Sequence, residues 1–171
     1  MNLQNLFELQ KQLDEHIEKK HPRKEGEDRL SKKILALQVE LGELSNEWRG
    51  FKFWSNDQEP RTTGKTTCPA CEGARRFIYP GVFEDGYTYS ETCAECQGDG
   101  WVYTDENPVL SEYVDCLHFI LSIGLDLKTT NIVIDSDYTG INATETFIIA
   151  FETTVELANA IREGNKSYIY Q

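Results

Sequence analysis

"ILALQVELGELSNEWRGFKFWS" (residues 34–55) is the stretch that decides the fold of this chain. Its apolar residues recur every three or four positions, and the same pattern extends back to predict an amphipathic helix over residues 28–48. Glu40 and Glu43 interrupt the pattern three positions apart, so their side chains share one face of that helix. Such a pair is either a solvated helix edge or a pair of ligands for a cation.

Helical periodicity continues outward from this stretch and predicts three further helices, over residues 2–20, 108–127 and 143–163. In the first, Leu6, Leu13 and Ile17 form an apolar stripe into which the polar Gln10 falls. The last should begin with a capping box, because Asn142 and Glu145 have the required spacing.

The helix expected over residues 108–127 is apolar almost all round, which is typical of a central, buried element. It nevertheless carries a second acidic pair at the same spacing, Glu112 and Asp115. Acids within such a helix are costly unless a cation or a hydrogen-bond network compensates them. Two matched pairs on two packed helices would suit Mg²⁺, and a solvated edge for each pair is the alternative.

Residues 61–106 differ from the rest of the chain, since glycines, cysteines and short β-prone runs are concentrated there. "CPAC" (68–71) and "CAEC" (93–96) place Cys68, Cys71, Cys93 and Cys96 in the paired spacing of a tetrahedral zinc site. Four thiolates leave no open position, so Zn²⁺ would be structural; four reduced core cysteines are the alternative. "CAECQGDG" resembles the knuckles of DnaJ-type chaperones, whereas Arg75 replaces the second glycine in the first knuckle.

Composition restricts the possible partners. The formal net charge is −12, and residues 61–106 hold four Arg or Lys against eight Asp or Glu, which argues against nucleic acid. No run of about 18 apolar residues predicts a membrane span, and the N-terminus lacks the pattern of a signal peptide. We therefore expect a cytoplasmic protein that contacts no membrane. We expect the insert to contact another protein, to form the edge of a lid or to extend a dimer.

Three ordered segments carry a family resemblance: "LFELQKQLDEHI" (6–17), the opening stretch, and "EYVDCLHFILSIGLDL" (112–127). They resemble the core segments of the dimeric dUTPases, which are all-α nucleoside triphosphate pyrophosphatases related to the MazG proteins. The resemblance implies a MazG/dimeric-dUTPase-like helical bundle formed by residues 1–60 and 107–171. Residues 61–106 would be a small zinc-ribbon-like β insertion, which explains the unusually long interval between the two acidic pairs.

The resemblance also implies an activity, the hydrolysis of dUTP to dUMP and pyrophosphate by a homodimer. Glu40, Glu43, Glu112 and Asp115 would bind Mg²⁺, and Glu40 would also act as the base that orients the attacking water. Six further residues would bind the substrate: Gln10, Asp14, Lys52, Trp54, His118 and Phe119. Self-association also follows from the pattern, because one short bundle would leave apolar helix faces uncovered.

Two other functions stay open. The C-terminal asparagine and basic residues of the dimeric dUTPases have no counterpart that can be placed in "EGNKSYIYQ" (163–171). Base selection could therefore differ, which would make the chain a MazG-like pyrophosphatase for dCTP or a modified nucleotide. The chain could also be a non-catalytic, zinc-dependent interaction protein on the same scaffold.

Overall fold

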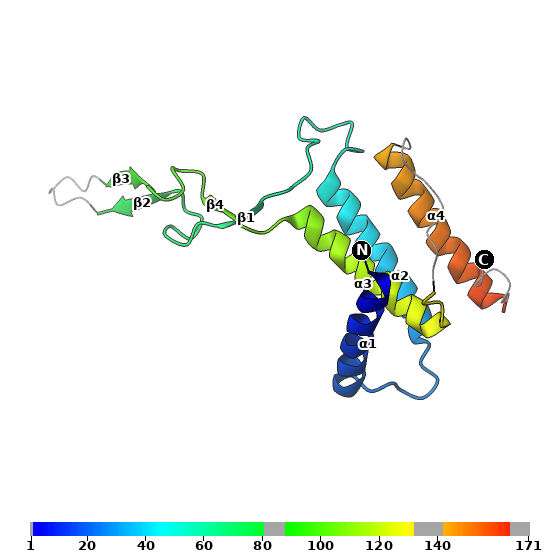
Figure 1. Cartoon of the computed structure of the whole chain (residues 1–171). Coiled ribbons are helices and arrows are strands. Elements are labelled where there is room, and N and C mark those ends of the chain that lie inside the picture. The colour runs from blue at the N-terminus through cyan, green and yellow to red at the C-terminus, as the bar shows by residue number, and fades with distance from the viewer. Residues whose placement is uncertain (1, 81–87, 132–141, 165–171) are drawn as a thin grey trace. The chain divides into compact units, whose positions relative to one another are not determined.

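The computed structural model describes residues 2–80, 88–131 and 142–164. These residues form four helices, α1 (Leu3–Lys20), α2 (Arg29–Trp48), α3 (Pro108–Leu127) and α4 (Ala143–Arg162). Four short strands, β1 (Gly64–Thr67), β2 (Arg76–Tyr79), β3 (Tyr89–Thr92) and β4 (Trp101–Thr104), lie between α2 and α3 in the chain. The prediction of an all-α protein with a small β insertion is confirmed (Figure 1).

The chain divides into two compact units, one of residues Met1–Pro60 with Val109–Gln171 and the other of Arg61–Pro108. We refer to them as the helical unit and the inserted module. The helices of the first unit begin and end close to the predicted positions because their caps are present. Asp28 accepts a hydrogen bond from the Ser31 amide at the start of α2, and Asn142 accepts one from the Glu145 amide at the start of α4.

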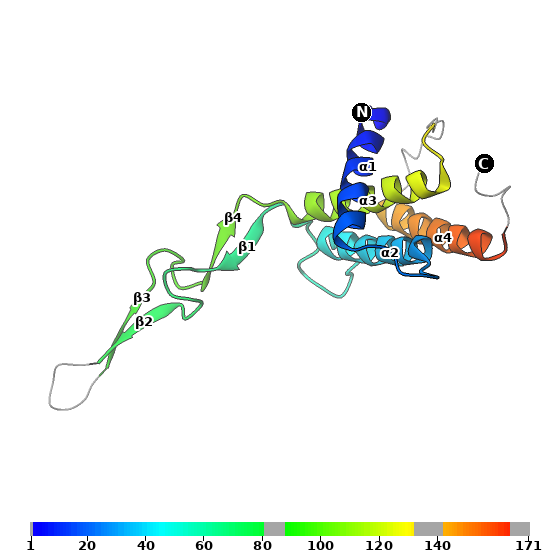
Figure 2. The same ribbon diagram turned by 90° about the horizontal axis from the view of Figure 1, so that it is seen from below.

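The helical core lies where α2, α3 and α4 meet. Ile34, Leu37 and Leu41 of α2 are buried against Cys116 and Ile123 of α3, and apolar residues of α4 complete the cluster. α2 and α4 run side by side in opposite directions (Figures 1 and 2), so that the Trp48 ring packs 5.3 Å from that of Phe147.

α1 packs on the core through a face that only partly coincides with the predicted apolar stripe, because Gln10 belongs to that stripe and Phe7 does not. Its buried residues are Phe7 and Gln10, whereas Leu13 and Ile17 are 38% and 43% exposed. The Phe7 ring lies so close to α3 at Gly124 that a Cβ there would come within 3.0 Å of it. This close approach accounts for a glycine inside α3.

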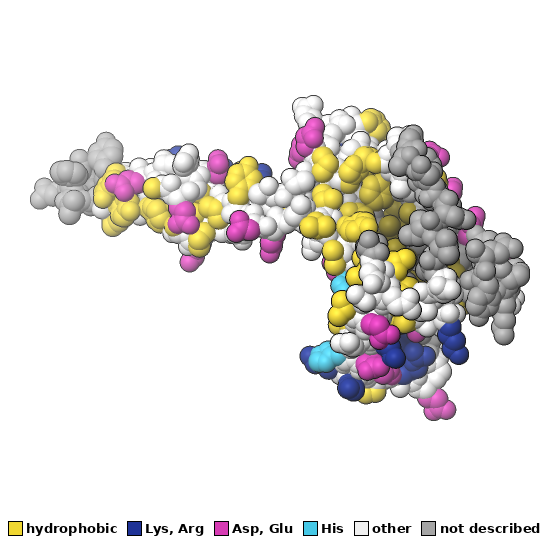
Figure 3. Space-filling model, viewed as in Figure 1, with side chains coloured by type: hydrophobic (Ala, Val, Ile, Leu, Met, Phe, Trp, Pro, Cys, Tyr) yellow, Lys and Arg dark blue, Asp and Glu magenta, His cyan; other side chains and the backbone are white. Residues whose placement is uncertain are grey.

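The expectation that α3 is buried on nearly all sides is wrong for the single chain. Leu110, Tyr113, Val114 and Ile120 are exposed, because the neighbouring helices pack against its other side. Figure 3 shows hydrophobic side chains gathered over α2 and α3. Of the described helices, α3 alone is long and apolar enough to cross a membrane by length and composition. That is weak evidence for a span, since core helices of soluble proteins pass the same test.

The inserted module consists of two antiparallel ribbons. β1 pairs with β4, with Gly64 opposite Thr104 and Thr67 opposite Trp101. β2 pairs with β3, with Arg76 opposite Thr92. Among the residues of the module that the structure describes there is no aliphatic core: the buried cluster is formed by Cys68, Cys71, Cys93 and Cys96, with Phe77 and Val102 partly buried against them.

Candidate functional site

Carboxylates from α2 and α3 converge at one point of the helical unit. One oxygen from each of Glu40, Glu112 and Asp115 lies within 4.8 Å of the others. The two helices lie side by side in both views (Figures 1 and 2), and the C-terminal half of α2 faces the N-terminal half of α3. The i, i+3 spacing then aims both acids of α3 at α2.

The acids repel one another. The pKa of Glu40 is raised above its ordinary value by partial burial and by the charges of Glu43 and Asp115. The pKa of Glu112 is raised by partial burial and then by the charges of Glu43 and Glu40. The neighbouring thiol of Cys116, on the core side, has its pKa raised to about 11 by burial and by these acids. A bound cation would relieve this repulsion, and carboxylate oxygens are the ligands that Mg²⁺ accepts.

Glu43 lies beside the cluster rather than within its closest set. Its side chain is exposed, and its charge is nevertheless the leading electrostatic influence on Glu112. Glu47, one turn further along α2, also raises the pKa of Glu112 and was not predicted as part of the site. Its position four residues after Glu43 is the signal that could have revealed it.

A hydrogen-bonded chain joins α1 to α3 next to the acids. The side chain of Gln10 is only 4% exposed, and its Nε2 donates to Asp14 Oδ1 at 2.7 Å. Its Oε1 lies 2.7 Å from Nδ1 of His118. Asp14 also accepts from Ser122 Oγ at 2.6 Å, and Lys33 Nζ of α2 lies 3.5 Å from it. Ser122 and Lys33 were not predicted; Ser122 could have been found as the residue one helical turn beyond His118.

These residues line a groove of about 770 Å³ in the helical unit. Asp115, His118 and Phe119 of α3 lie along it together with Gln10 and Asp14 of α1. Four of the six predicted substrate residues and one predicted metal ligand therefore face a single groove. Figure 3 shows basic and acidic side chains around the lower part of α1. The apolar residues Leu13, Ile17 and Leu125 also line the groove, and charged residues make up the rest of its border: Lys11, Glu15, Glu18, Arg23, Glu27, Arg29, Lys32, Lys33 and Asp126.

Lys52 and Trp54 do not line this groove. They lie in the loop that follows α2, which turns at Arg49 with a φ of 65° and is held where the Arg49 guanidinium donates to the Asp57 carbonyl. The Lys52 ammonium contacts the side-chain oxygen of Asn46, and the Trp54 side chain is 66% exposed. The roles predicted for these two residues stay predictions.

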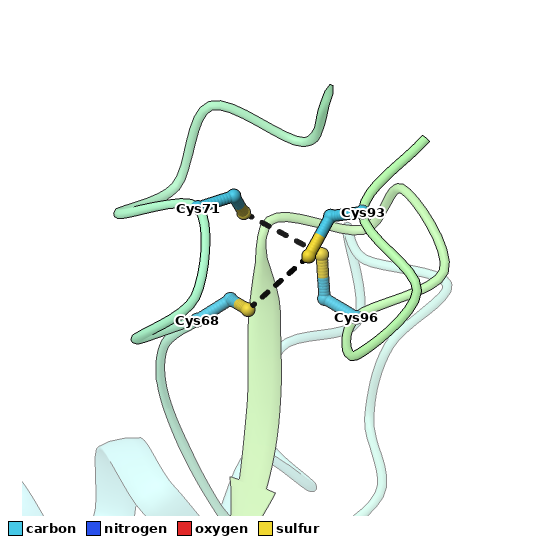
Figure 4. A group of neighbouring side chains, drawn as sticks. All are labelled: Cys68, Cys71, Cys93 and Cys96. Carbon is cyan, nitrogen blue, oxygen red and sulfur yellow. Dashed lines mark hydrogen bonds between the residues drawn. The ribbon is translucent and has the colours of Figure 1, made fainter. Parts of the chain in front are cut away.

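The four cysteines of the inserted module form a second cluster (Figure 4). Their sulfur atoms all lie within 4.8 Å of one another, with Cys68 Sγ 3.8 Å from Cys93 Sγ and Cys71 Sγ 3.7 Å from Cys96 Sγ. Sulfurs that bind zinc tetrahedrally at about 2.3 Å are about 3.8 Å apart, and a disulfide would require about 2.05 Å. The donor set and its spacing therefore fit Zn²⁺.

The two knuckles have the same backbone course. Cys68 N donates to Gly100 O and Cys93 N donates to Arg75 O, each at 3.0 Å. Gly100 and Arg75 occupy equivalent positions and both have positive φ, 82° and 71°. Arg75 thus adopts, at the site of the missing glycine, the left-handed conformation that the knuckle requires.

Backbone amides favour thiolate in this cluster. Burial would raise the pKa of Cys96, but hydrogen bonds from the amides of Gly100 and Gly98 and from the side chains of Cys71 and Cys93 lower it to about 7. Burial instead raises the pKa of Cys68 to about 11. Thiolate is the form that binds metal, so binding would release protons from the cluster.

A family model described as dUTPase matches residues 2–67 and 102–171. The part that it leaves out contains all four paired cysteines. Neither a curated protein nor a solved structure is similar enough to this chain to count as a match. Because the family match covers most of the chain, including α1, α2, α3 and α4, the chain belongs to the dUTPase family of dimeric, all-α nucleotide pyrophosphohydrolases.

Proposed function

We propose that the chain is a dUTP diphosphatase that hydrolyses dUTP to dUMP and pyrophosphate with Mg²⁺. The observation that carries this proposal is the convergence of Glu40, Glu112 and Asp115 within 4.8 Å beside the groove, in a chain of the dUTPase family. These three carboxylates, with Glu43 beside them, would hold the metal. Mg²⁺ supplies positive charge that stabilises the triphosphate as negative charge shifts onto the leaving pyrophosphate.

Side chains of the protein supply the proton acceptor and the contacts to the nucleoside. Glu40 accepts a proton from the attacking water as the water oxygen bonds to phosphorus and the bond to pyrophosphate breaks. Partial burial and the charges of Glu43 and Asp115 raise its pKa, which is the direction that strengthens a carboxylate as a general base. Phe119 offers a flat face against which a base can pack, and Gln10, Asp14 and His118 supply polar groups at the groove wall.

The decisive experiment measures pyrophosphate release from dUTP, dCTP, dTTP and dATP, with and without Mg²⁺. The wild type should prefer dUTP and require the metal. Glu43→Gln should lose most of the activity at saturating Mg²⁺, whereas Glu152→Gln, on the exposed surface of α4, should retain it. A preference for dCTP would favour the broader pyrophosphatase reading, and no turnover of any nucleotide would favour a non-catalytic interaction protein.

We also propose that the inserted module binds one structural Zn²⁺ through Cys68, Cys71, Cys93 and Cys96. Its support is the sulfur spacing and the absence of an aliphatic core among the described residues of the module. A module of this size gains most of its stability from such a metal. Reduced thiols in this number fit the cytoplasm.

We further infer a homodimer. Leu110, Tyr113, Val114 and Ile120 leave an apolar strip on α3 exposed in the single chain. Strips of this kind are covered in stable assemblies. Light scattering should give twice the mass of one chain, and a monomer at micromolar concentration would contradict the inference.

A further inference from the structure

The buried amide of Gln10 can take only one orientation. Its Nε2 lies 2.7 Å from Asp14 Oδ1, and a carboxylate only accepts hydrogen bonds. The NH₂ group must therefore face Asp14, which leaves Oε1 facing Nδ1 of His118 at 2.7 Å. Reversing the amide would set two acceptors against each other in a site that is 4% exposed, where an unsatisfied polar group costs about 1–3 kcal/mol.

This orientation decides which nitrogen of His118 carries the proton. An amide oxygen only accepts, so Nδ1 of His118 must donate to Gln10. In the neutral imidazole the other nitrogen, Nε2, then has a free lone pair. Nε2 has no partner within the ranges that the structure describes, and His118 is exposed along the groove beside Asp115 and Phe119.

We propose that Asp14 and Gln10 are positioning residues that hold neutral His118 as its Nδ1–H tautomer, with Nε2 presented to the groove as a hydrogen-bond acceptor. Asp14 is itself anchored from two other helices, by Ser122 Oγ of α3 at 2.6 Å and by the Lys33 ammonium of α2. Lys33 is held in turn by Asp126 at 2.7 Å. Residues of α1, α2 and α3 together thus keep the proton of the exposed His118 ring on Nδ1.

An acceptor at this place selects for a ligand that brings a donor. The identity of that ligand rests on the proposed function, although the tautomer does not. A 2′-deoxyuridine nucleotide offers two donors, the N3–H of the base and the 3′-hydroxyl of the sugar. Cytosine lacks the first, because its N3 is itself an acceptor, but it carries a different donor, the amino group on C4, so only an acceptor placed opposite N3 distinguishes the two bases. His118 would therefore favour uracil if it faces N3 of the base, and would be indifferent to the base if it faces the sugar.

The tautomer can be read by ¹⁵N NMR of the free, full-length protein without any assay of activity. The chain has three histidines, and the signals of His118 are those lost in His118→Asn. We expect protonated Nδ1 and unprotonated Nε2 in the wild type. Gln10→Leu and Asp14→Asn should each weaken this preference, the second because an amide at position 14 no longer dictates the orientation of Gln10.

Gln12→Leu, an exposed change on the same helix, is the matched control and should leave the His118 signals unchanged. A wild-type His118 that carries its proton on Nε2 would overturn the proposal, even if neither variant folds. So would an unchanged tautomer in folded Asp14→Asn and Gln10→Leu.

Ligand titration tests the acceptor role. Adding dUMP should shift the Nε2 signal of His118. Loss of the shift with dCMP alone identifies the base N–H as the donor, and loss with 2′,3′-dideoxyuridine monophosphate alone identifies the hydroxyl. Equal shifts with all three, or none with any, would overturn this part of the proposal. A protein with the expected tautomer and shifts but no dUTP hydrolysis would refute the proposed function and leave this inference standing.

Discussion

Replacing Glu112 with glutamine should stabilise the metal-free protein while removing its response to Mg²⁺. Glu112 lies within 4.8 Å of both Glu40 and Asp115, measured between carboxylate oxygens. Two unit charges at that separation repel by about 0.9 kcal/mol in water, and by several times more in a partly buried site. The substitution removes two such pairs, so we expect a gain of about 1 to 2 kcal/mol at low salt after screening.

The raised pKa of Glu112 determines how the effect of the substitution on stability changes with pH. In the fold the pKa of Glu112 is raised, first by burial and then by Glu43 and Glu40, so the native state holds its proton to higher pH than the unfolded chain does. The contribution of Glu112 to the stability of the metal-free protein is therefore fully present below the ordinary pKa of 4.5 and is lost as pH rises through the folded pKa. Glu112→Gln should flatten this fall and should match the wild type at acidic pH.

Urea unfolding at pH 5 and pH 7.5, in EDTA and in Mg²⁺, measures all of these effects. Mg²⁺ at one hundred times its dissociation constant should stabilise the wild type by about 2.7 kcal/mol and the variant much less. Glu152→Gln, an exposed change on α4, controls for the loss of one negative charge. If Glu112→Gln destabilises the metal-free protein at pH 7.5, or if both variants respond equally to Mg²⁺, the acids do not form a shared cation site.

Three further predictions concern the inserted module. Cys93→Ser should lose the bound zinc, measured by metal analysis, and should unfold the module while far-ultraviolet circular dichroism retains the helices; Cys116→Ser should keep one zinc per chain. Gly100→Ala should weaken zinc retention against a chelator, because φ is 82° there and the new Cβ would come within 3.0 Å of Gly73 O. Arg75→Gly should instead improve retention, by about 1 kcal/mol at most, since glycine adopts the left-handed conformation without strain.

Local chemistry made the helices and the cysteine cluster predictable. α2 begins where Asp28 caps it and α4 where Asn142 does, and both residues are legible in the sequence. The paired Cys-x-x-Cys spacing likewise determines that four sulfurs can meet. What the spacing could not reveal is that Arg75 would adopt a left-handed conformation in place of glycine, because only the surrounding hydrogen bonds impose it.

Burial was harder to predict than secondary structure. On α1 the hydrophobic stripe indicated Leu13 and Ile17 as the packing face, yet Phe7 and Gln10 are the buried residues. A buried glutamine is destabilising unless its amide is hydrogen-bonded. The partners of Gln10 are Asp14 on the same helix and His118 on α3. The periodicity of α1 alone reveals neither these hydrogen-bond partners nor which side of the helix they will bury.

The interruption of the family match has a structural counterpart that explains how the module can be inserted between α2 and α3. The match stops after Thr67 and resumes at Val102, and these residues lie one step apart across the β1–β4 ladder, where Thr67 pairs with Trp101. The ladder continues to the edge of the module, where Gly64 N donates to Glu106 O at 2.8 Å. The strand by which the chain enters the module, β1, is therefore hydrogen-bonded to the strand by which it leaves, β4. Because this ladder and the cysteine cluster lie within the module, losing its metal need not move Glu112 relative to Glu40.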